Sequence, residues 1–414
     1  MQRSDLELMA PAGSGEALSA AIAAGADSVY FGVGRLNMRA HAAGNFELKD
    51  LPRVMERCRA AGVKGYLAVN TVLYDEEMDE LRTLLDAAAG AQVSAVIASD
   101  MAAVTAARER GLAVHLSTQL NISNAQALAF YAPYAETAVL ARELNLMQVA
   151  AIARAVRERP ILGSTGRAVR LEMFCHGALC MAQSGRCWMS LHTRGKSANR
   201  GECLQSCRRT YDLVDRERGT EIRLENGYVL SPRDLKTIGF LDRMVQAGVT
   251  VFKIEGRARG ADYVKTVTAC YDEALRAVAD GTYGEADRTR WDAPLAAVFN
   301  RGFWAGHYLG AETADIVTSY GSAATERKVF VGRCVNYFAK ARVAQVELLA
   351  GELAPGEKVL FTGPTTGAVY AAPGVLMDEA GRVSKAVRGM KITMAVAETV
   401  RAGDKVYRMD SAGR

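Results

Sequence analysis

The chain has 414 residues, of which half are apolar and 23% are charged, a balance that excludes wholesale disorder. Its 51 basic and 46 acidic residues leave an excess of five positive charges, which is compatible with a polyanionic partner but does not require one. The sequence has no run of about 18 apolar residues and no apolar signal-peptide core near Met1, so we expect a cytoplasmic protein that does not cross a membrane.

Short apolar runs alternate with amphipathic stretches through the first two thirds of the chain. Eight of these runs are predicted strands, at residues 6–13, 27–33, 64–70, 93–99, 112–118, 137–142, 169–177 and 250–256. Buried parallel strands joined by helices have this pattern, and eight such units predict an α/β fold of the (β/α)₈ TIM-barrel type. A doubly wound open sheet is the alternative, but no G-x-G-x-x-G sequence opens the first strand-to-helix turn.

The character of the sequence changes after residue 285. We expect the barrel to occupy residues 1–285, with a cysteine-rich insertion at 173–210 near its last strands, and a helical, aromatic bridge to occupy 286–324. Short alternating strands broken by Gly, Pro and Asn predict a small antiparallel β-barrel at 325–414. Four aromatic residues of the bridge are expected to pack at the junction between the two domains: Phe299, Phe303, Trp304 and Tyr308.

Polar side chains gather at the ends of the predicted strands, where barrels of this type carry their active sites. A loop charge or helix cap explains any one of them, but several that converge on one barrel mouth indicate a functional site. The candidates are Asn70, Gln119, Arg142, Glu172, His176, Lys253, Glu255 and Arg257.

Five of the eight cysteines lie between residues 175 and 207. Four of them, Cys180, Cys187, Cys203 and Cys207, have the spacing C-x6-C-x15-C-x3-C, in which only the last pair is as tight as in common zinc sites. Disulfides are rare in the cytosol, so this pattern favours a thiolate-bound metal and leaves zinc and iron–sulfur open, with a nucleophile or packing thiols as the remaining alternative. Cys175 and His176 are adjacent, and adjacent residues of a strand point to opposite faces, which argues against a nucleophilic pair.

The remaining three cysteines, Cys58, Cys270 and Cys334, lie in helical or strand patterns and are predicted to be buried packing thiols.

The segments "LEMFCHGALCMAQSGRCWMS" and "NRGECLQSCR", together with "STQLNISN", "FKIEGR" and "FNRGFWAGHYLG", resemble the collagenase-like peptidase family of bacteria over nearly the whole chain. The family includes oxygen-independent hydroxylation proteins that carry a 4Fe–4S cluster. The length and the small C-terminal domain resemble its tRNA hydroxylation branch, which implies prephenate-dependent formation of 5-hydroxyuridine at the wobble position. A protease, or hydroxylation of rRNA or of a ubiquinone precursor, is the alternative.

The resemblance also implies roles for individual residues. The cluster ligands would be Cys180, Cys187, Cys203 and Cys207, and residues 176–232 would form the housing of the cluster. We expect Arg142, Arg233 and Arg257 to hold the two carboxylates of prephenate as co-substrate, because forked guanidinium groups suit carboxylates. Proton transfer is assigned to Glu172, His176 and Glu255, and further substrate contacts to Lys253, Gln119 and Asn70. The implied partners are tRNA and an electron donor or a homologous partner subunit.

Overall fold

Eight parallel strands close into a barrel in the computed structural model, which describes residues 2–41, 45–222, 227–311 and 313–412. Each strand pairs with the next along the chain, and the last one pairs with both the first and the seventh, which completes the ring. The predicted (β/α)₈ barrel is therefore confirmed. Its strands are β1 (Glu7–Pro11), β2 (Ser28–Gly32), β3 (Lys64–Val69), β4 (Ala95–Ala98), β5 (Val114–Leu116), β6 (Thr137–Val139), β7 (Arg170–Gly177) and β11 (Val251–Ile254).

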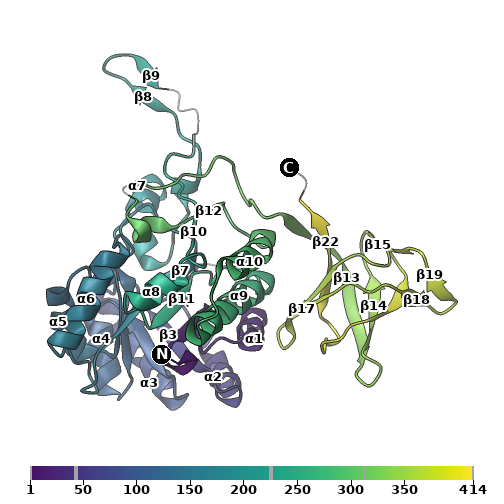
Figure 1. Cartoon of the computed structure of the whole chain (residues 1–414), viewed down its shortest axis with the longest axis horizontal. Coiled ribbons are helices and arrows are strands. Elements are labelled where there is room, and N and C mark those ends of the chain that lie inside the picture. The colour runs from purple at the N-terminus through teal and green to yellow at the C-terminus, as the bar shows by residue number, and fades with distance from the viewer. Residues whose placement is uncertain (1, 42–44, 223–226, 312, 413–414) are drawn as a thin grey trace.

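Helices follow the strands and surround the barrel (Figure 1). Several begin at a side chain that accepts a backbone N–H of the first turn, which satisfies donors that the helix itself cannot pair. Ser14, Asp100, Asn124 and Asn145 are such caps. The helices are α1 (Gly15–Ala23), α2 (Leu51–Ala60), α3 (Met78–Gly90), α4 (Met101–Glu109), α5 (Ala125–Tyr131), α6 (Leu146–Glu158), α8 (Leu241–Gln246), α9 (Ala261–Asp280) and α10 (Glu285–Ala297).

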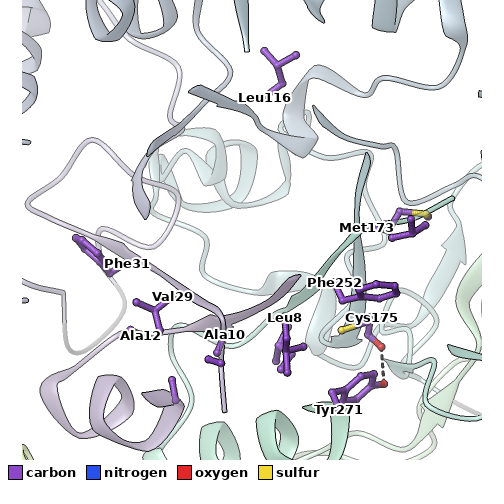
Figure 2. Close-up of a cluster of buried hydrophobic side chains, with 14 of the residues drawn as sticks. Leu8, Ala10, Ala12, Val29, Phe31, Leu116, Met173, Cys175, Phe252 and Tyr271 are labelled. Carbon is purple, nitrogen blue, oxygen red and sulfur yellow. Dashed lines mark hydrogen bonds between the residues drawn. The ribbon is translucent and has the colours of Figure 1, made fainter. Parts of the chain in front are cut away.

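Alternate side chains of each strand point outward to the helices or inward to the barrel lumen. The outward set forms the main hydrophobic core, and Figure 2 shows Leu8, Phe252 and Cys175 within it. The lumen holds a smaller apolar group that includes Met9, Tyr30 and Tyr66. The lumen is therefore a packed interior that also contains charged groups.

The chain leaves the barrel after β7 and returns to it at β11. The excursion contains α7 (Met189–Arg194), a hairpin of β8 (Leu213–Asp215) and β9 (Thr220–Ile222) that projects from the body, and β10 (Asp234–Lys236), which pairs antiparallel with β7 (Figure 1). A further strand, β12 (Phe303–Trp304), pairs with β10.

The bridge aromatics pack against the barrel and not at the domain junction, which corrects the prediction for them. The Tyr308 hydroxyl donates to the Phe174 carbonyl over 2.8 Å, and the Phe303 ring lies 5.6 Å from the His176 ring. Phe299 stacks under Arg259, and the Trp304 indole donates to the Arg233 carbonyl. The reason is that β12 extends the sheet beside β10 and carries these rings with it.

The C-terminal residues form an antiparallel sheet around a core of their own, as predicted. Its order is β17-β16-β22-β13-β14-β21-β18-β19, and β15 pairs with β20 beside it. The strands are β13 (Glu326–Phe338), β14 (Val343–Leu348), β15 (Glu352–Leu353), β16 (Val359–Gly363), β17 (Gly367–Ala371), β18 (Leu376–Asp378), β19 (Gly381–Val383), β20 (Ala386–Val387), β21 (Lys391–Ala395) and β22 (Lys405–Ser411).

This C-terminal sheet docks on the barrel through β16 and β17, which contact α1 and α9. The Ser19 hydroxyl donates to the Pro364 carbonyl over 2.7 Å, and Lys328 pairs with Asp262 at 2.9 Å. Leu360 and Ala368 of the sheet belong to the main core of the barrel. The junction therefore consists of helix faces packed against one hairpin, with an additional ion pair from β13.

Cys58, Cys270 and Cys334 are buried thiols, as predicted. Among the described residues, no helix is long and apolar enough to cross a membrane.

A buried carboxylate joins three strands at the N-terminal end of the barrel. Glu7 on β1 contacts Lys64 at 3.0 Å and Arg170 at 2.6 Å, and it accepts the Tyr66 hydroxyl over 2.6 Å. Burial opposes its charge, but Arg170, Lys64 and the Tyr66 hydroxyl overcome this and lower the pKa of Glu7 from 4.5 to about 2.

Replacement of Glu7 by Gln should therefore destabilise the fold at neutral pH by about 3 kcal/mol, because a pKa unit corresponds to about 1.4 kcal/mol. The contribution of Glu7 is complete above its ordinary pKa and disappears as pH falls from 4.5 to about 2. Urea unfolding at pH 7 and pH 3 measures this effect, with exposed Glu56→Gln as control. A Glu7→Gln deficit that does not shrink at pH 3 would contradict the electrostatic account.

Candidate active site at the barrel mouth

A charged triad lies in the lumen below the mouth. Glu172 on β7 is completely buried, and it accepts the Lys253 ammonium of β11 over 2.8 Å. His115 on β5 lies on its other side, with Nδ1 3.5 Å from Oε2. Burial opposes the charge of Glu172, yet Lys253 and His115 hold its pKa below the ordinary range. This carboxylate is therefore ionised, and it neutralises Lys253, which also lies over the Tyr30 ring at 4.6 Å.

One rim of the mouth is built from arginines at the end of β11 and in the loop after β2. Glu255 pairs with Arg39 at 2.9 Å, whereas Arg257 is buried and donates to the Asn37 side-chain oxygen over 3.0 Å. Burial opposes the charge of Glu255, but Arg39 and Arg259 outweigh it and lower its pKa. Burial lowers the pKa of Arg257 to about 10, so this cation remains charged at neutral pH while its hydrogen-bond partner is neutral.

The adjoining part of the mouth, at the ends of β3 and β5, borders a cavity of about 180 Å³, which is lined mostly by uncharged side chains and by the Asp100 carboxylate. The Gln119 amide donates to the Asn70 carbonyl over 3.0 Å, and the Asn70 side chain accepts the Met38 N–H over 3.2 Å. Thr71 also lines the cavity, and its buried hydroxyl has no hydrogen-bond partner among the described residues. Asn70 and Gln119 therefore meet, as their places at strand ends predict.

The cysteine-rich segment, residues 178–210, lies across this mouth. Arg142, at the end of β6, donates to the Ser184 hydroxyl over 2.6 Å, and Asn121 donates to the Ser184 carbonyl over 3.1 Å. The Asn199 side chain accepts the Cys187 N–H, and the Asn199 carbonyl accepts the N–H of the residue after Thr71.

Two further contacts hold the segment to the loops after β2 and β3. Arg200 forms a forked pair with Glu77 at 2.6 and 2.9 Å. Gly201 has φ of +84°, and a Cβ there would lie 2.5 Å from the Asn37 carbonyl oxygen. A residue without a side chain is required at this approach.

The four cysteines of this segment influence one another electrostatically. Burial raises the pKa of Cys207, and the charges of Cys180, Cys203 and Cys187 raise it further. Burial also raises the pKa of Cys187, again with contributions from Cys180 and Cys203. Among the described residues, no three His, Cys, Asp or Glu side chains are placed to bind one metal ion. The thiols are thus within electrostatic reach of one another without forming a compact single-ion site.

Cys175 and His176 lie outside the mouth, in the shell between β7 and α9. The pairing of β7 with β11 shifts register here, because Lys253 pairs with Phe174 and Ile254 pairs with His176. Cys175 is thus an extra residue in β7, and the strict alternation assumed for this strand fails at that point.

Tyr271 caps this bulge. Its hydroxyl donates to the Cys175 carbonyl over 2.7 Å and lies 3.3 Å from His176 Nδ1 (Figure 2 shows the first bond). Burial lowers the pKa of His176 to about 3 and raises that of the Cys175 thiol well above 9. The structure places His176 against aromatic rings, and the charges of Lys236 and Arg259 add to the lowering of its pKa.

Arg233 also stands apart from the other candidates. It pairs with Asp315 at 2.9 Å, and its side chain is about one third exposed. Sequence reasoning missed Asn37, Arg39 and His115. His115 was detectable as a lone polar residue in the apolar run 112–118, whereas Asn37 and Arg39 lie in an irregular loop without a pattern.

Residues 13–318 match the model of peptidase family U32, so the chain belongs to that family. A protein named collagenase from Porphyromonas gingivalis is 53% identical over 410 residues, which cover 99% of each chain. The tRNA hydroxylation protein P1 of Bacillus subtilis is 30% identical over 389 residues, 92% of this chain and 89% of that protein. The 23S rRNA 5-hydroxycytidine C2501 synthase of Escherichia coli is 36% identical over 274 residues, 66% of this chain and 40% of that protein. The family membership that the cysteine motifs predict is confirmed.

Removal of one partner of the Glu172–Lys253 ion pair should lower the free energy of unfolding more than removal of both partners. Lys253→Met leaves the Glu172 carboxylate buried without its cation, a change that typically costs about 3–5 kcal/mol. The double variant Glu172→Gln/Lys253→Met should be more stable than Lys253→Met alone, since no buried charge is left. Chemical denaturation measures both.

The matched control is Lys236→Met, which breaks the more exposed pair Lys236–Asp292 and should cost about 1 kcal/mol or less. Equal losses for Lys253→Met and Lys236→Met would show that the Glu172–Lys253 pair is not desolvated.

Proposed function

We propose that this protein hydroxylates an RNA base without molecular oxygen, and that its substrate is the wobble uridine of a cytoplasmic tRNA, which becomes 5-hydroxyuridine. The observation that carries the proposal is the gathering of four thiols on a segment that lies across a charged barrel mouth. Relatives named for tRNA and rRNA hydroxylation share 27–36% identity with this chain and support the same chemistry. Uridine and water yield 5-hydroxyuridine, two electrons and two protons, so the proposal includes an electron-accepting protein that takes up the two electrons.

The thiols suit a polynuclear cluster. Cys180, Cys187, Cys203 and Cys207 supply the four thiolates that a 4Fe–4S cluster takes. Such a cluster spreads its ligands more widely than one zinc ion does, which fits thiols that interact without a single-ion geometry. Burial and mutual repulsion disfavour the thiolates of Cys187 and Cys207, and the cationic iron–sulfur core would offset this cost. When bound, a 4Fe–4S group with four cysteine ligands supplies electron transfer at the mouth.

The arginines of the mouth provide sites for an anionic co-substrate. Arg257 is a buried cation whose hydrogen-bond partner is the neutral Asn37, and Arg142 donates to the neutral Ser184. Either guanidinium could form a forked bond to a carboxylate, and such bonds are the strong class of hydrogen bond. We therefore assign Arg257 and Arg142 to the two carboxylates of prephenate. The role predicted for Arg233 in binding a prephenate carboxylate stays a prediction, because its guanidinium group already pairs with Asp315.

Two carboxylates are available to hold protons during the reaction. Glu255 lies at the mouth, held by Arg39, and is the group that a substrate reaches first. Glu172 lies below it, and Lys253 keeps it ionised. We assign proton acceptance to Glu255 and the positioning of Lys253 to Glu172. The role predicted for His176 stays a prediction, since its ring is buried among aromatic side chains.

The peptidase alternative finds less support in the described residues. No serine, threonine or cysteine side chain there hydrogen bonds to a histidine ring, the arrangement of a Ser–His or Cys–His nucleophile. The Ser184 hydroxyl accepts from Arg142, which does not activate it as a nucleophile, and the Cys175 thiol is completely buried.

Loss of one cluster cysteine should abolish modification, whereas loss of a packing cysteine should not. Cells that lack the gene are complemented with wild type, Cys187→Ala or Cys334→Ala, and their tRNA nucleosides are measured by mass spectrometry. We expect 5-hydroxyuridine derivatives with wild type and Cys334→Ala only. Anaerobically purified wild type should contain about four irons per chain, and Cys187→Ala should contain few.

Normal modification by Cys187→Ala would overturn the proposal. So would colourless wild-type protein with one zinc per chain. Ser184→Ala separates the two enzyme classes, because it should retain RNA modification but would abolish a serine peptidase.

A further inference from the structure

The net positive charge of the chain is confined to its C-terminal part. Residues 325–414 contain 14 basic and 9 acidic residues, an excess of 14 − 9 = 5. The first 324 residues contain 51 − 14 = 37 basic and 46 − 9 = 37 acidic residues, and are neutral. Positive charge that is concentrated on one small domain is a feature of proteins that bind a polyanion.

Part of this charge forms a row across four strands of the C-terminal sheet. The registers pair Lys405 with Arg333, Arg333 with Glu347, and Glu347 with Lys391. Directly paired residues share a face, and this is the outer face, because the neighbouring residue Cys334 is buried in the core. Lys405, Arg333 and Lys391 are exposed, and none has an ion-pair partner among the described residues.

The next rung on this face is polar and uncharged. It runs from Asn336 to Gln345 and Thr393. Strands lie about 4.8 Å apart, so Lys405 and Lys391 are separated by about 14 Å, enough to contact more than one phosphate. Amide and hydroxyl groups beside them can bond to phosphate and ribose oxygens. These neutral donors favour RNA over an acidic protein as the occupant.

The basic row continues to the barrel through the β16–β17 hairpin. Asp404 accepts the Arg401 N–H over 2.7 Å and the Thr366 hydroxyl over 2.6 Å, which anchors Arg401 at this hairpin. Arg57 on α2 lies within electrostatic reach of Arg401. Burial lowers the pKa of Arg57, and the charges of Arg53 and Arg401 lower it further. Such crowding of cations is relieved by an anion.

We propose that the outer face of the C-terminal sheet, centred on Lys405, Arg333 and Lys391, binds the phosphate backbone of the substrate RNA. This inference rests on the proposed function and names the surface by which the full chain holds its tRNA. The hairpin that carries Thr366 also lies against α1, where Pro364 contacts Gly15. α1 starts directly after β1, at the mouth end of the barrel. The hairpin therefore links the basic row to that end of the barrel.

The double reversal Arg333→Glu/Lys391→Glu should weaken the binding of bulk tRNA by the full chain at least about tenfold at 0.1 M salt. It should also reduce the slope of log K against log salt by about 2, one for each lost phosphate contact. The matched control is Arg154→Glu/Arg159→Glu, on α6 and at the residue directly after it, which reverses two exposed charges of the barrel and should leave affinity within twofold. Melting temperatures check that both variants are folded.

The possible results distinguish failure of the proposed RNA-binding surface from failure of the proposed hydroxylase function. If wild type modifies tRNA in cells and Arg333→Glu/Lys391→Glu binds and modifies it equally well, the surface is wrong and the hydroxylase proposal stands. If wild type neither binds tRNA nor forms 5-hydroxyuridine, both fall. If the reversal impairs binding of polyglutamate but not of tRNA, the partner is an acidic protein and the inference is overturned.

Discussion

The pairing of β7 with β11 is the constraint on which the rest of the site depends. It closes the barrel, and it sets Glu172 and Lys253 side by side in the lumen. β7 then runs directly into the cysteine-rich segment, and β11 runs into Glu255 and Arg257 at the rim. One strand pair therefore delivers the thiols, the lumen ion pair and the arginine rim to the same end of the barrel. The bulge at Cys175 absorbs the mismatch outside the lumen, where packing tolerates it.

The electrostatics of the mouth follow from how each cation is partnered. Lys253 faces a carboxylate in the lumen, so its charge is neutralised before any ligand arrives. Arg257 is equally well buried but bonds to an amide oxygen, and no carboxylate among the described residues lies within ion-pair distance of it, although the charge of Glu255 acts on it. Burial of such a cation without an ion-pair partner lowers the stability of the fold. An arrangement of this kind is expected where an anion binds, because the bound anion then provides the missing partner.

The sequence predicts this fold well because each strand is an apolar run of the right length, and eight of them leave few topologies. It predicts Asn70, Gln119, Glu255 and Arg257 at the mouth for the same reason, since strand ends converge. His176 shows the limit of the argument, because its surroundings depend on a bulge and on Tyr271, 95 residues away. Asn37 and Arg39 lie in an irregular loop, and only the folded chain brings them to Arg257 and Glu255. Tertiary packing determines the surroundings of such residues, and the local sequence pattern does not predict them.

The docking of the C-terminal sheet decides from which side a large substrate approaches. The sheet rests on α1, and α1 follows the loop in which Gly13 lies against the Arg257 backbone, where a Cβ would be 1.7 Å from the carbonyl oxygen. The arginine rim therefore lies next to the sheet, while Asn70 and Gln119 line the cavity beneath the cysteine-rich segment. A nucleotide that leaves its stack to enter the mouth from this side would meet Arg257 and Glu255 before the cavity. The arginine rim thus suits phosphate and co-substrate carboxylates, and the amide groups of Asn70 and Gln119 in the cavity suit hydrogen bonds to a base.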